Sequence, residues 1–502
     1  TYAELVEEVE SIAAGLAARG VKTGTRFATA LPNLYDHCLV ALALHRLGAV
    51  VALLNFRLKA EDIAALVERT RIEGAVILPD PDLAARLRTV LPAGAPLFAA
   101  GGAAGAAEDL AACRGARASA PPYPSLDPEA PSMLFYTSGT TGLPKGVLLA
   151  HRTHEPRVTW LPTQVGFRGG THLRSLAIAP LSHAIGYHGI FLSTLAFSGT
   201  FYALSPLEPS RALDVIERNA INYLFTLPTI LQGLVGAPSY SPERMRSLET
   251  VYWGGAPIDP ALYDRLRREW PAKLGHIYGT TETMCALCNP EPADQPDVLR
   301  QVYGSRVRIA DLTDFDRTVA AGADGELLID ATTDAIFSGY LDRPDATAEK
   351  LRAGWYLTGD GAVELPDGSV RLLGRVDDMI RSGGEYIQPE EVETVLRSHP
   401  AVRDVAVVGI TDPKWGQIAI ACVAGDAGAA PALDLDRLCR ESRVANFKRP
   451  RGYVYLEALP WSPAGKLLRR ELRAIATRAR GGDGAIRFED LSSGVAAAPN
   501  RS

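Results

Sequence analysis

Short apolar runs alternate with amphipathic helical patterns along the first part of the chain, and this alternation limits the possible folds more than any other feature. Apolar side chains repeat at helical spacing from Leu5 to Leu16, and Gly20 supplies a stop, so a helix is predicted over residues 2–19. Strands are predicted at 27–31 and 75–78, and helices at 34–47 and 60–70. Strands that alternate with helices are typical of an α/β domain with a largely parallel sheet.

The chain has 502 residues, which is too long for one hydrophobic core, so two or more domains are expected. An Ala-, Gly- and Pro-rich segment over residues 99–132 is predicted to be a linker before the strand 133–136. A second α/β unit follows, with predicted strands at 175–179, 223–225 and 251–252 and helices at 209–219 and 259–269. The large N-terminal part is therefore expected to hold two α/β subdomains.

The pattern changes from about residue 302 to short alternating strands and turns, as at 325–329 and 368–373, which indicates a β-rich subdomain. The end of the chain reads as a small α+β unit. Its predicted helices are 389–398, 433–441 and 466–476, and its strands are 403–410 and 418–424. The Gly-, Ala- and Ser-rich tail, 481–502, is predicted to be disordered.

Composition excludes several classes of protein. Hydrophobic residues make up 47% and charged residues 22%, close to the averages for folded domains, so wholesale disorder is not expected. A net charge of −6 argues against nucleic acid or an anionic membrane as the main partner. The longest apolar runs, such as 47–54, are far shorter than the ~18 residues that cross a bilayer. No secretory signal is visible, and a helical pattern starts directly after Thr1, so the natural N-terminus is expected to be missing.

Six cysteines are too few for a disulfide framework in a chain of this length, which favours a reducing, cytoplasmic location. Cys285 and Cys288 form a C-x-x-C pair, but no second pair or nearby C-x-x-H completes a zinc site. The pair is therefore interpreted as two incidental thiols.

Residues 136–146, Tyr-Thr-Ser-Gly-Thr-Thr-Gly-Leu-Pro-Lys-Gly, are termed the phosphate loop because their chemistry suits an anion. Successive backbone N–H groups of a Gly-rich turn form an anion-binding nest, hydroxyls add donors, and Lys145 adds a positive charge. A P-loop would read G-x-x-x-x-G-K-[ST], whereas here Pro144 precedes the lysine and Gly146 follows it. Taken alone, the segment could equally be an ordinary surface loop.

Four further motifs follow downstream. They are Tyr278-Gly-Thr-Thr-Glu282, Tyr356-Leu-Thr-Gly-Asp360, Gly374-Arg-Val-Asp-Asp-Met-Ile380 and Pro463-Ala-Gly-Lys466. The first offers an aromatic ring for a purine and a carboxylate for Mg²⁺ beside phosphate, and the second offers a carboxylate for ribose hydroxyls. Each also has an ordinary explanation as a helix cap, a surface turn, a solvated charge cluster or a surface lysine.

Together the five motifs, in this order, resemble the adenylate-forming superfamily of acyl-CoA and aryl-CoA synthetases, luciferases and nonribosomal adenylation domains. The closest likeness is to the 4-chlorobenzoate:CoA ligases, and it lies in 43–49, 53–59, 163–166 and 374–384. The resemblance implies an adenylation domain over 1–375 with the acyl and ATP sites, a hinge over 376–378 and a mobile C-terminal domain over 379–480. It also implies two steps: a carboxylate attacks ATP to give an acyl-adenylate, and a thiol then displaces AMP.

The same resemblance implies roles for individual residues, with ATP, Mg²⁺ and coenzyme A as reactants or cofactor. The β- and γ-phosphates would contact Thr137, Ser138, Gly139, Thr140, Thr141, Gly142 and Lys145. The AMP moiety would contact Gly254, Gly255, Ala256, Tyr278, Gly279 and Thr281, and its ribose Asp360 and Arg375. Glu282 would bind Mg²⁺, Lys466 would bridge the carboxylate and the α-phosphate, and Asp377 would be the hinge. CoA would contact Gly383, Gly384, Trp415, Phe447, Arg449 and Arg451.

An apolar and aromatic set would enclose the acyl group: Trp160, His183, Ala184, Ile185, Phe225, Gly254, Ile277, Gly279, Met284 and Cys285. His183 would lie near the reacting carboxylate. Such a pocket suits a flat ring, and it lacks an aspartate for an amino-acid ammonium group. The chain departs from the 4-chlorobenzoate:CoA ligases at Trp160, Gly254 and Cys285, which the resemblance would make Phe, Ala and Asn. A benzoate-type acid is therefore predicted, with its ring substituent open.

Three other functions stay open at this point. A short- or medium-chain fatty acyl-CoA synthetase or a stand-alone adenylation enzyme that loads a carrier protein would keep the first half-reaction. A non-enzymatic nucleotide-binding module would keep only the ATP loops, and Lys466 argues against it. A homodimer is one candidate oligomeric state.

Overall fold

The structure is a computed structural model that describes the chain except residues 116–118, 138–143, 165–169, 292–294, 384, 443, 462–466, 483–486 and 492–502. The chain divides into two compact units, Thr1–Arg308 with Leu328–Thr358 and Ile309–Leu327 with Gly359–Ser502. The predicted boundary at residue 375 stays a prediction, since these units divide the β-rich segment differently. None of the described helices is both long enough and apolar enough to span a membrane.

The first sheet of the first unit has the strand order β17-β7-β6-β2-β1-β3-β4-β5. Its strands are β1 (Arg26–Ala30), β2 (Val50–Leu53), β3 (Gly74–Ile77), β4 (Leu97–Ala99), β5 (Glu108–Asp109), β6 (Pro131–Thr137), β7 (Lys145–Ala150) and β17 (Gly339–Tyr340). The pairs among β1 to β6 are parallel, and β7 adds antiparallel pairs with β6 and β17. The predicted helical crossovers are confirmed as α1 (Tyr2–Ala18), α2 (Tyr35–Arg46) and α3 (Ala60–Arg69), and α4 (Pro81–Val90) follows β3.

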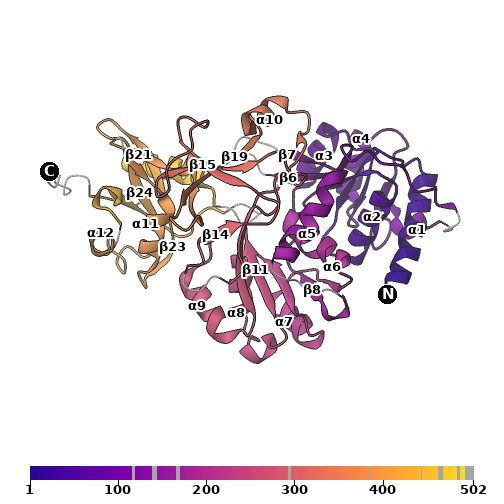
Figure 1. Cartoon of the computed structure of the whole chain (residues 1–502), viewed down its shortest axis with the longest axis horizontal. Helices are drawn as coiled ribbons and strands as arrows, with labels where there is room; N and C mark the ends of the chain where they lie inside the picture. Colours follow the sequence, from indigo (N-terminus) through magenta and orange to yellow (C-terminus); the bar gives the residue numbers. More distant parts are fainter. Residues whose placement is uncertain are drawn as a thin grey trace. The chain divides into compact units, whose positions relative to one another are not determined.

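Side chains alternate between the two faces of this sheet, as the two-residue period of a strand requires. Phe27, Val51 and Phe135 belong to one core cluster with α1 and α2, whereas their chain neighbours Ala28 and Ala52 belong to another with α3 and α4. Helices therefore cover both faces, which is the arrangement expected of parallel strands (Figure 1).

In the second sheet, the strands of the first unit follow the order β9-β8-β10-β11-β12-β13-β14. Its strands are β8 (Arg174–Ala177), β9 (Thr200–Ala203), β10 (Tyr223–Thr226), β11 (Thr250–Gly254), β12 (Lys273–Tyr278), β13 (Leu287–Asn289) and β14 (Val298–Gln301). Helices α7 (Pro209–Arg218), α8 (Pro228–Val235) and α9 (Pro260–Glu269) cover its outer face. Its inner face joins the same core cluster as the first sheet, together with α5 (His154–Gln164), the π-helix η5 (Ile185–Leu192) and α6 (Ser193–Ala196).

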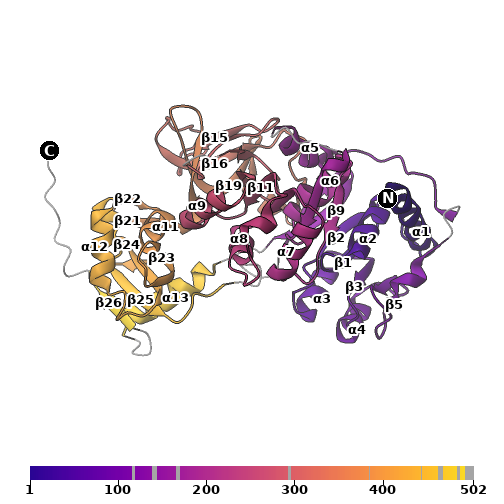
Figure 2. The same cartoon turned by 90° about the horizontal axis from the view of Figure 1, so that it is seen from below.

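The β-rich segment adds β15 (Val307–Ala310), β16 (Asp324–Asp330), α10 (Pro344–Lys350), β18 (Leu351–Arg352), β19 (Trp355–Glu364) and β20 (Val370–Arg375). In the second unit a six-stranded sheet consists of β21 (Ile380–Ser382), β22 (Glu385–Ile387), β23 (Val402–Asp412), β24 (Gly416–Gly425), β25 (Gly452–Leu456) and β26 (Arg487–Asp490). Helices α11 (Pro389–Arg397) and α12 (Ala432–Glu441) cover one face, and α13 (Arg469–Arg480) covers the other. Figure 2 shows these strands and helices in the orange and yellow part of the chain.

Three sequence-based predictions differ from the structure. The linker predicted over 99–132 contains β5, which pairs with β4, and a 3₁₀ turn over Leu110–Cys113 whose buried ends pack in the core. The last helix ends at Arg480 instead of 476, because Ala476 and Ala479 continue its apolar face. The tail predicted to be disordered from 481 contains β26, so the prediction is wrong for Arg487–Asp490. There Phe488 packs over Gly452 of β25, where a Cβ atom would come within 2.7 Å of the ring.

Candidate active site

The carboxyl ends of β11 and β12 place two predicted ATP segments side by side. The two strands are parallel and pair Gly254 with Ile277, so Gly254-Gly255-Ala256 and Tyr278 leave the sheet at the same edge. A Cβ atom on Gly254 would lie 2.8 Å from the Ile277 carbonyl oxygen, and Gly255 has a φ of +78°. Both positions therefore need glycine, and ligands of open α/β sheets bind at such an edge.

The turn from Tyr278 to Met284 is closed by its own main chain. The Met284 N–H donates to the Thr280 carbonyl at 2.8 Å, and the Ala286 N–H donates to the Tyr278 carbonyl at 2.9 Å. A Cβ atom on Gly279 would lie 1.4 Å from the Met284 carbonyl oxygen, so no other residue fits there without a backbone shift. The turn thus holds Thr280 to Glu282 in one compact loop at the end of β12.

Glu282 is only 6% exposed, and its carboxylate and its carbonyl are both held by the β17 segment. The Tyr340 hydroxyl donates to Glu282 Oε1 at 2.7 Å, and the Phe337 N–H donates to the Glu282 carbonyl at 2.8 Å. Lys145 lies over the ring of the same tyrosine, with its Nζ 5.1 Å from the centre of the Tyr340 ring. The structure therefore brings the lysine of the phosphate loop and the predicted Mg²⁺ ligand to one tyrosine.

The antiparallel pairing of β6 with β7 holds the two ends of the phosphate loop together, since Thr137 is paired with Lys145. The Tyr136 hydroxyl is hydrogen-bonded to Thr70 Oγ1 at 2.9 Å, and burial raises the pKa of Tyr136 to about 12. Five predicted phosphate ligands lie outside the described residues: Ser138, Gly139, Thr140, Thr141 and Gly142.

An aromatic wall behind the turn escaped the sequence analysis. The rings of Phe337 and Tyr340 lie 5.0 Å apart, and those of Phe337 and Tyr356 lie 5.7 Å apart. Burial raises the pKa of Tyr356, whereas its hydrogen bond with Thr280 acts in the opposite direction. In the sequence, Tyr356 stands out only as the start of a ribose-binding motif, and no local pattern identifies Phe337 or Tyr340, because contacts between rings at three separate points of the chain leave no mark in the sequence.

Arg157 of α5 also escaped the sequence analysis, although it contacts the predicted site directly. Its guanidinium donates three hydrogen bonds to main-chain carbonyls: Nε to Ala335 at 2.9 Å, Nη1 to Thr281 at 3.0 Å and Nη2 to Glu282 at 2.8 Å. Burial lowers the pKa of Arg157 to about 9, and the Glu282 carboxylate partly opposes this effect. The available signal was a charged residue beside Val158 and four positions before Leu161, on the apolar face of a helix.

Most of the predicted acyl-pocket residues fall in one hydrophobic cluster. Ala184, Phe225, Ile277, Met284 and Cys285 are buried members, and Trp160 and Ile185 pack against it. A Cβ atom on Gly189 would come within 2.7 Å of the Phe225 ring and 3.2 Å of Met284 Cε, so these two side chains meet there.

Trp160 approaches Gly304 closely enough that a Cβ atom on that glycine would lie 2.5 Å from the indole ring. His183 lies just before the π-helix η5: its N–H donates to the Pro180 carbonyl at 3.0 Å, and its carbonyl accepts from the Tyr187 N–H at 2.9 Å. π-Helical turns often occur at functional sites.

All six cysteines are buried thiols in the structure. Burial raises the pKa of Cys285, and it raises that of Cys288 to about 11, so neither ionises readily near neutral pH. Within the described ranges, no group of three or more His, Cys, Asp or Glu side chains is arranged to hold a metal ion.

Several predicted residues belong to the second unit. Asp360 and Arg375 face each other across β19 and β20 and form an ion pair at 2.8 Å, so the two predicted ribose ligands lie together. Asp377 lies in the 3₁₀ turn η7 (Val376–Asp378), and its carbonyl accepts a hydrogen bond from Arg473 Nη2 at 3.1 Å. Arg473 also pairs with the Asp378 carboxylate at 2.8 Å.

The predicted CoA residues are brought together only in part. The Gly383 N–H donates to the Trp415 carbonyl at 2.8 Å, and the Arg451 guanidinium lies 4.4 Å from the centre of the Trp415 ring. Phe447 is exposed. Arg449, in contrast, is buried and ion-paired with Asp436, so its phosphate-binding role stays a prediction. Gly384 and Lys466 lie outside the described residues.

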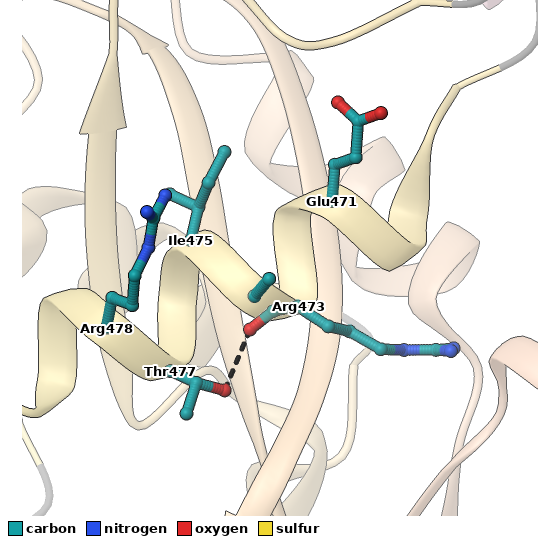
Figure 3. Close-up of a pocket in the computed structure, with 6 residues that line it drawn as sticks. Glu471, Arg473, Ile475, Thr477 and Arg478 are labelled. Carbon is teal, nitrogen blue, oxygen red and sulfur yellow. Dashed lines mark hydrogen bonds between the residues drawn. The ribbon is translucent and has the colours of Figure 1, made fainter.

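A hollow of about 620 Å³ lies along α13 and is lined by Glu471, Arg473, Ala474, Ile475, Thr477 and Arg478. Figure 3 shows that these side chains come from one helix, where the Thr477 hydroxyl donates to the Arg473 carbonyl at 2.8 Å. None of them is a predicted site residue, so this hollow is not the candidate active site.

Comparison with known proteins matches residues 1–341 to the AMP-binding enzyme family and 391–466 to the AMP-binding enzyme C-terminal domain. A 4-chlorobenzoate–CoA ligase of Arthrobacter sp. is 40% identical, with 94% of this chain and 89% of that protein covered. Among solved structures, ATP-bound MatB from Rhodopseudomonas palustris has a TM-score of 0.84 at 25% identity, with coverages of 94% and 93%.

The o-succinylbenzoate CoA synthetase MenE of Bacillus subtilis, solved with its acyl-adenylate intermediate, has a TM-score of 0.80 at 25% identity, again with coverages of 94% and 93%. These matches agree with the family that the motif order indicates. The chain therefore belongs to the family of AMP-binding enzymes, the adenylate-forming superfamily that its motifs resemble.

Proposed function

We propose that this chain is an ATP-dependent aryl-CoA ligase that converts a benzoate-type acid into an aryl-adenylate and then into the aryl-CoA thioester. One observation carries the proposal: the apolar cluster of Phe225, Ile277 and Met284 borders the Tyr278–Glu282 turn, in a chain 40% identical to a 4-chlorobenzoate–CoA ligase. A flat ring buried in the cluster would place its carboxylate near the turn.

In the first step a carboxylate oxygen attacks the α-phosphorus of ATP, and pyrophosphate leaves. The work of the protein is to position both reactants and to stabilise the charge that moves between the phosphates. Thr281 is the proposed donor to the α-phosphate. Lys145 and the hydroxyls of the phosphate loop are the proposed partners of the β- and γ-phosphates, and Lys466 the bridge between carboxylate and phosphate.

Glu282 suits a magnesium ion that is shared with a nucleotide. Mg²⁺ usually binds through one or two carboxylates plus substrate phosphates, keeping several waters. A single buried carboxylate with one oxygen held by Tyr340 agrees with that pattern, and a cage of several acidic residues is not required. When bound there, Mg²⁺ would neutralise charge on the phosphate oxygens. Tyr278 and Gly254–Ala256 are the proposed adenine contacts, and Asp360 and Arg375 the proposed ribose contacts.

In the second step the thiol of CoA attacks the acyl carbon and AMP leaves. Gly383, Trp415 and Arg451 form the part of the proposed CoA site that lies together, with an aromatic face for adenine and a guanidinium for phosphate. We propose that rotation about Asp377 removes Lys466 and admits the thiol, so that one site serves both steps. His183 is proposed to lie near the carboxylate, and a cytoplasmic location is proposed for the enzyme.

The test is ATP–pyrophosphate exchange with a panel of ring-substituted benzoates and short and medium alkanoates, followed by thioester formation with free CoA. Exchange and thioester formation with benzoates are expected. Preference for alkanoates would replace the aryl assignment by a fatty acyl one. Turnover with a carrier protein but not with CoA would indicate a loading enzyme, and no exchange with any acid would reject a ligase.

A further inference from the structure

Arg157 ties three distant segments of the first unit together. It lies on α5, two of its hydrogen bonds end on the Thr281–Glu282 peptide groups, and the third ends on Ala335, just before β17. It is 3% exposed, so these contacts are made away from water. Each of its three nitrogens donates to a different carbonyl, which uses three of the five N–H donors of the guanidinium.

The main chain of Glu282 is consequently held from two sides. Its carbonyl accepts hydrogen bonds from Arg157 Nη2 at 2.8 Å and from the Phe337 N–H at 2.8 Å, while its carboxylate accepts from the Tyr340 hydroxyl at 2.7 Å. Phe337 and Tyr340 belong to the same segment as Ala335, whose carbonyl accepts a hydrogen bond from Arg157. A displacement of Arg157 would therefore loosen the turn and its support together.

A buried guanidinium is a costly way to hold a loop. Removing a charge from water is strongly unfavourable unless hydrogen bonds compensate, and neutral carbonyls compensate less than a carboxylate does. An apolar side chain would pack α5 against the core without this desolvation penalty, as Val158 and Leu161 do on the same helix. The presence of Arg157 is therefore better explained by the geometry that it imposes on Thr281 and Glu282 than by a contribution to the stability of the fold.

We infer that Arg157 is a positioning residue of the adenylation step, which sets the Thr281–Glu282 main chain so that the Glu282 carboxylate meets the magnesium–nucleotide complex. The inference rests on the proposed function, in which Thr281 and Glu282 contact the α-phosphate and Mg²⁺. The three hydrogen bonds of Arg157 all end on main-chain carbonyls. Arg157 acts through two of these carbonyls, those of Thr281 and Glu282, which it orients.

Two variants separate charge from geometry. Arg157→Lys keeps a positive charge but presents a single nitrogen, so it cannot reach all three carbonyls. Arg157→Gln removes the charge and keeps some hydrogen bonding. Arg152→Gln is the matched control, because Arg152 donates to the Asp334 carbonyl at 2.9 Å on the same segment and to Glu129, without touching the 281–282 turn.

The first measurement is direct binding of Mg²⁺ with α,β-methylene-ATP, a non-reacting nucleotide, by titration calorimetry. The second is the Mg²⁺ concentration that gives half-maximal ATP–pyrophosphate exchange. Loss of a group that orients a metal ligand typically weakens metal affinity or activity by about 10- to 100-fold. Both Arg157 variants are expected to show a loss of that size in both measurements, with KM for the acid unchanged, while Arg152→Gln stays close to wild type.

Melting curves are recorded for every variant. Arg157 variants that fold and bind the magnesium–nucleotide complex as wild type does would overturn the inference. So would failure of both Arg157 variants to fold while Arg152→Gln folds, since Arg157 would then hold the fold and not the site. If the wild-type protein shows no exchange with any acid, the proposed function fails, and the binding titration still decides the role of Arg157.

Discussion

Individual glycines in the candidate site are required by what lies against them. Gly279 abuts the Met284 carbonyl, Gly254 abuts the Ile277 carbonyl, and Gly304 abuts the Trp160 ring. The first two allow the main chain of the Tyr278 turn to close at the edge of the sheet. The third leaves room for an indole where the related ligases are expected to carry a smaller ring, so Trp160 is the residue whose size should bear on the choice of acid.

Replacing Trp160 by phenylalanine is expected to change the ring substituent that is accepted. The smaller side chain opens volume in the proposed pocket, and a change of about one methylene is worth ~1–3 kcal/mol in discrimination. The ratio of kcat/KM for 4-chlorobenzoate to that for benzoate should rise by about 10-fold or more. Trp461→Phe, an exposed tryptophan of the second unit, is the control. An unchanged ratio in Trp160→Phe would place the indole outside the acyl pocket.

His37 is expected to make the stability of the first unit depend on pH. Its ring is fully buried, Nδ1–H donates to the Pro32 carbonyl at 3.1 Å and Nε2 accepts from Thr29 at 2.9 Å, which fits the neutral form. Burial lowers the pKa of His37 from 6.5 to about 4. As the pH falls below 6.5, the unfolded chain binds a proton that the folded protein excludes, so stability is lost between pH 6.5 and about 4.

The contribution of one such histidine approaches about 1.4 kcal/mol per pH unit. His37→Gln should reduce the pH dependence of the free energy of unfolding in this window by about that amount, measured by urea denaturation and tryptophan fluorescence. A smaller slope should remain, because burial also lowers the pKa of His45, His154, His188 and His276. Thr29→Val is the control: it removes the hydroxyl but keeps the titrating ring, so it should lower stability and retain the slope. A wild-type slope in His37→Gln would contradict the burial account.

At the scale of elements, strand β26 forms although the local sequence does not predict a strand. It is only Arg487–Asp490, and it forms because β25 offers an open edge and Gly452 leaves a space for the Phe488 ring. Composition predicted disorder there, since the surrounding residues are small and polar. Edge pairing to a distant strand supplied what the local sequence lacked.

Phe488→Ala is therefore expected to destabilise the second unit. Full loss of a buried phenylalanine costs about 3–5 kcal/mol, and a partly exposed ring should cost roughly 2 kcal/mol. The free energy of unfolding measured by denaturant titration provides the value. Leu433→Ala removes an exposed apolar side chain of α12 in the same unit and should change stability little. Equal effects of the two substitutions would show that β26 does not contribute to the folded unit.

At the scale of the whole molecule, the proposed mechanism uses one site in two arrangements, and Lys466 separates them. Lys466→Ala should abolish adenylate formation, because no cation then bridges the carboxylate and the α-phosphate. Conversion of supplied aryl-adenylate and CoA to thioester should be largely spared. The two half-reactions are measured separately, by pyrophosphate exchange and by AMP release. An equal loss in both would count against domain rotation.

Periodicity and motifs alone predicted the α/β class, elements such as α1, α2, β1, β23 and β24, the motif order and the family, whereas many short strands were not predicted. These predictions were possible because side-chain periodicity and short motifs are local, and each is read within a few residues. The geometry of the site was predicted only where a motif leaves the end of a strand, as at Gly254 and Tyr278.

The sequence did not predict that Tyr340 contacts both Lys145 and Glu282 or that Arg449 pairs with Asp436, because these contacts arise from packing in three dimensions. The tertiary structure alone identified Arg157, whose carbonyl partners lie 124, 125 and 178 residues away along the chain. Every residue carries a main-chain carbonyl, so the partners of Arg157 leave no mark in the sequence. Their meeting depends on how the two sheets and the β17 segment pack around one core.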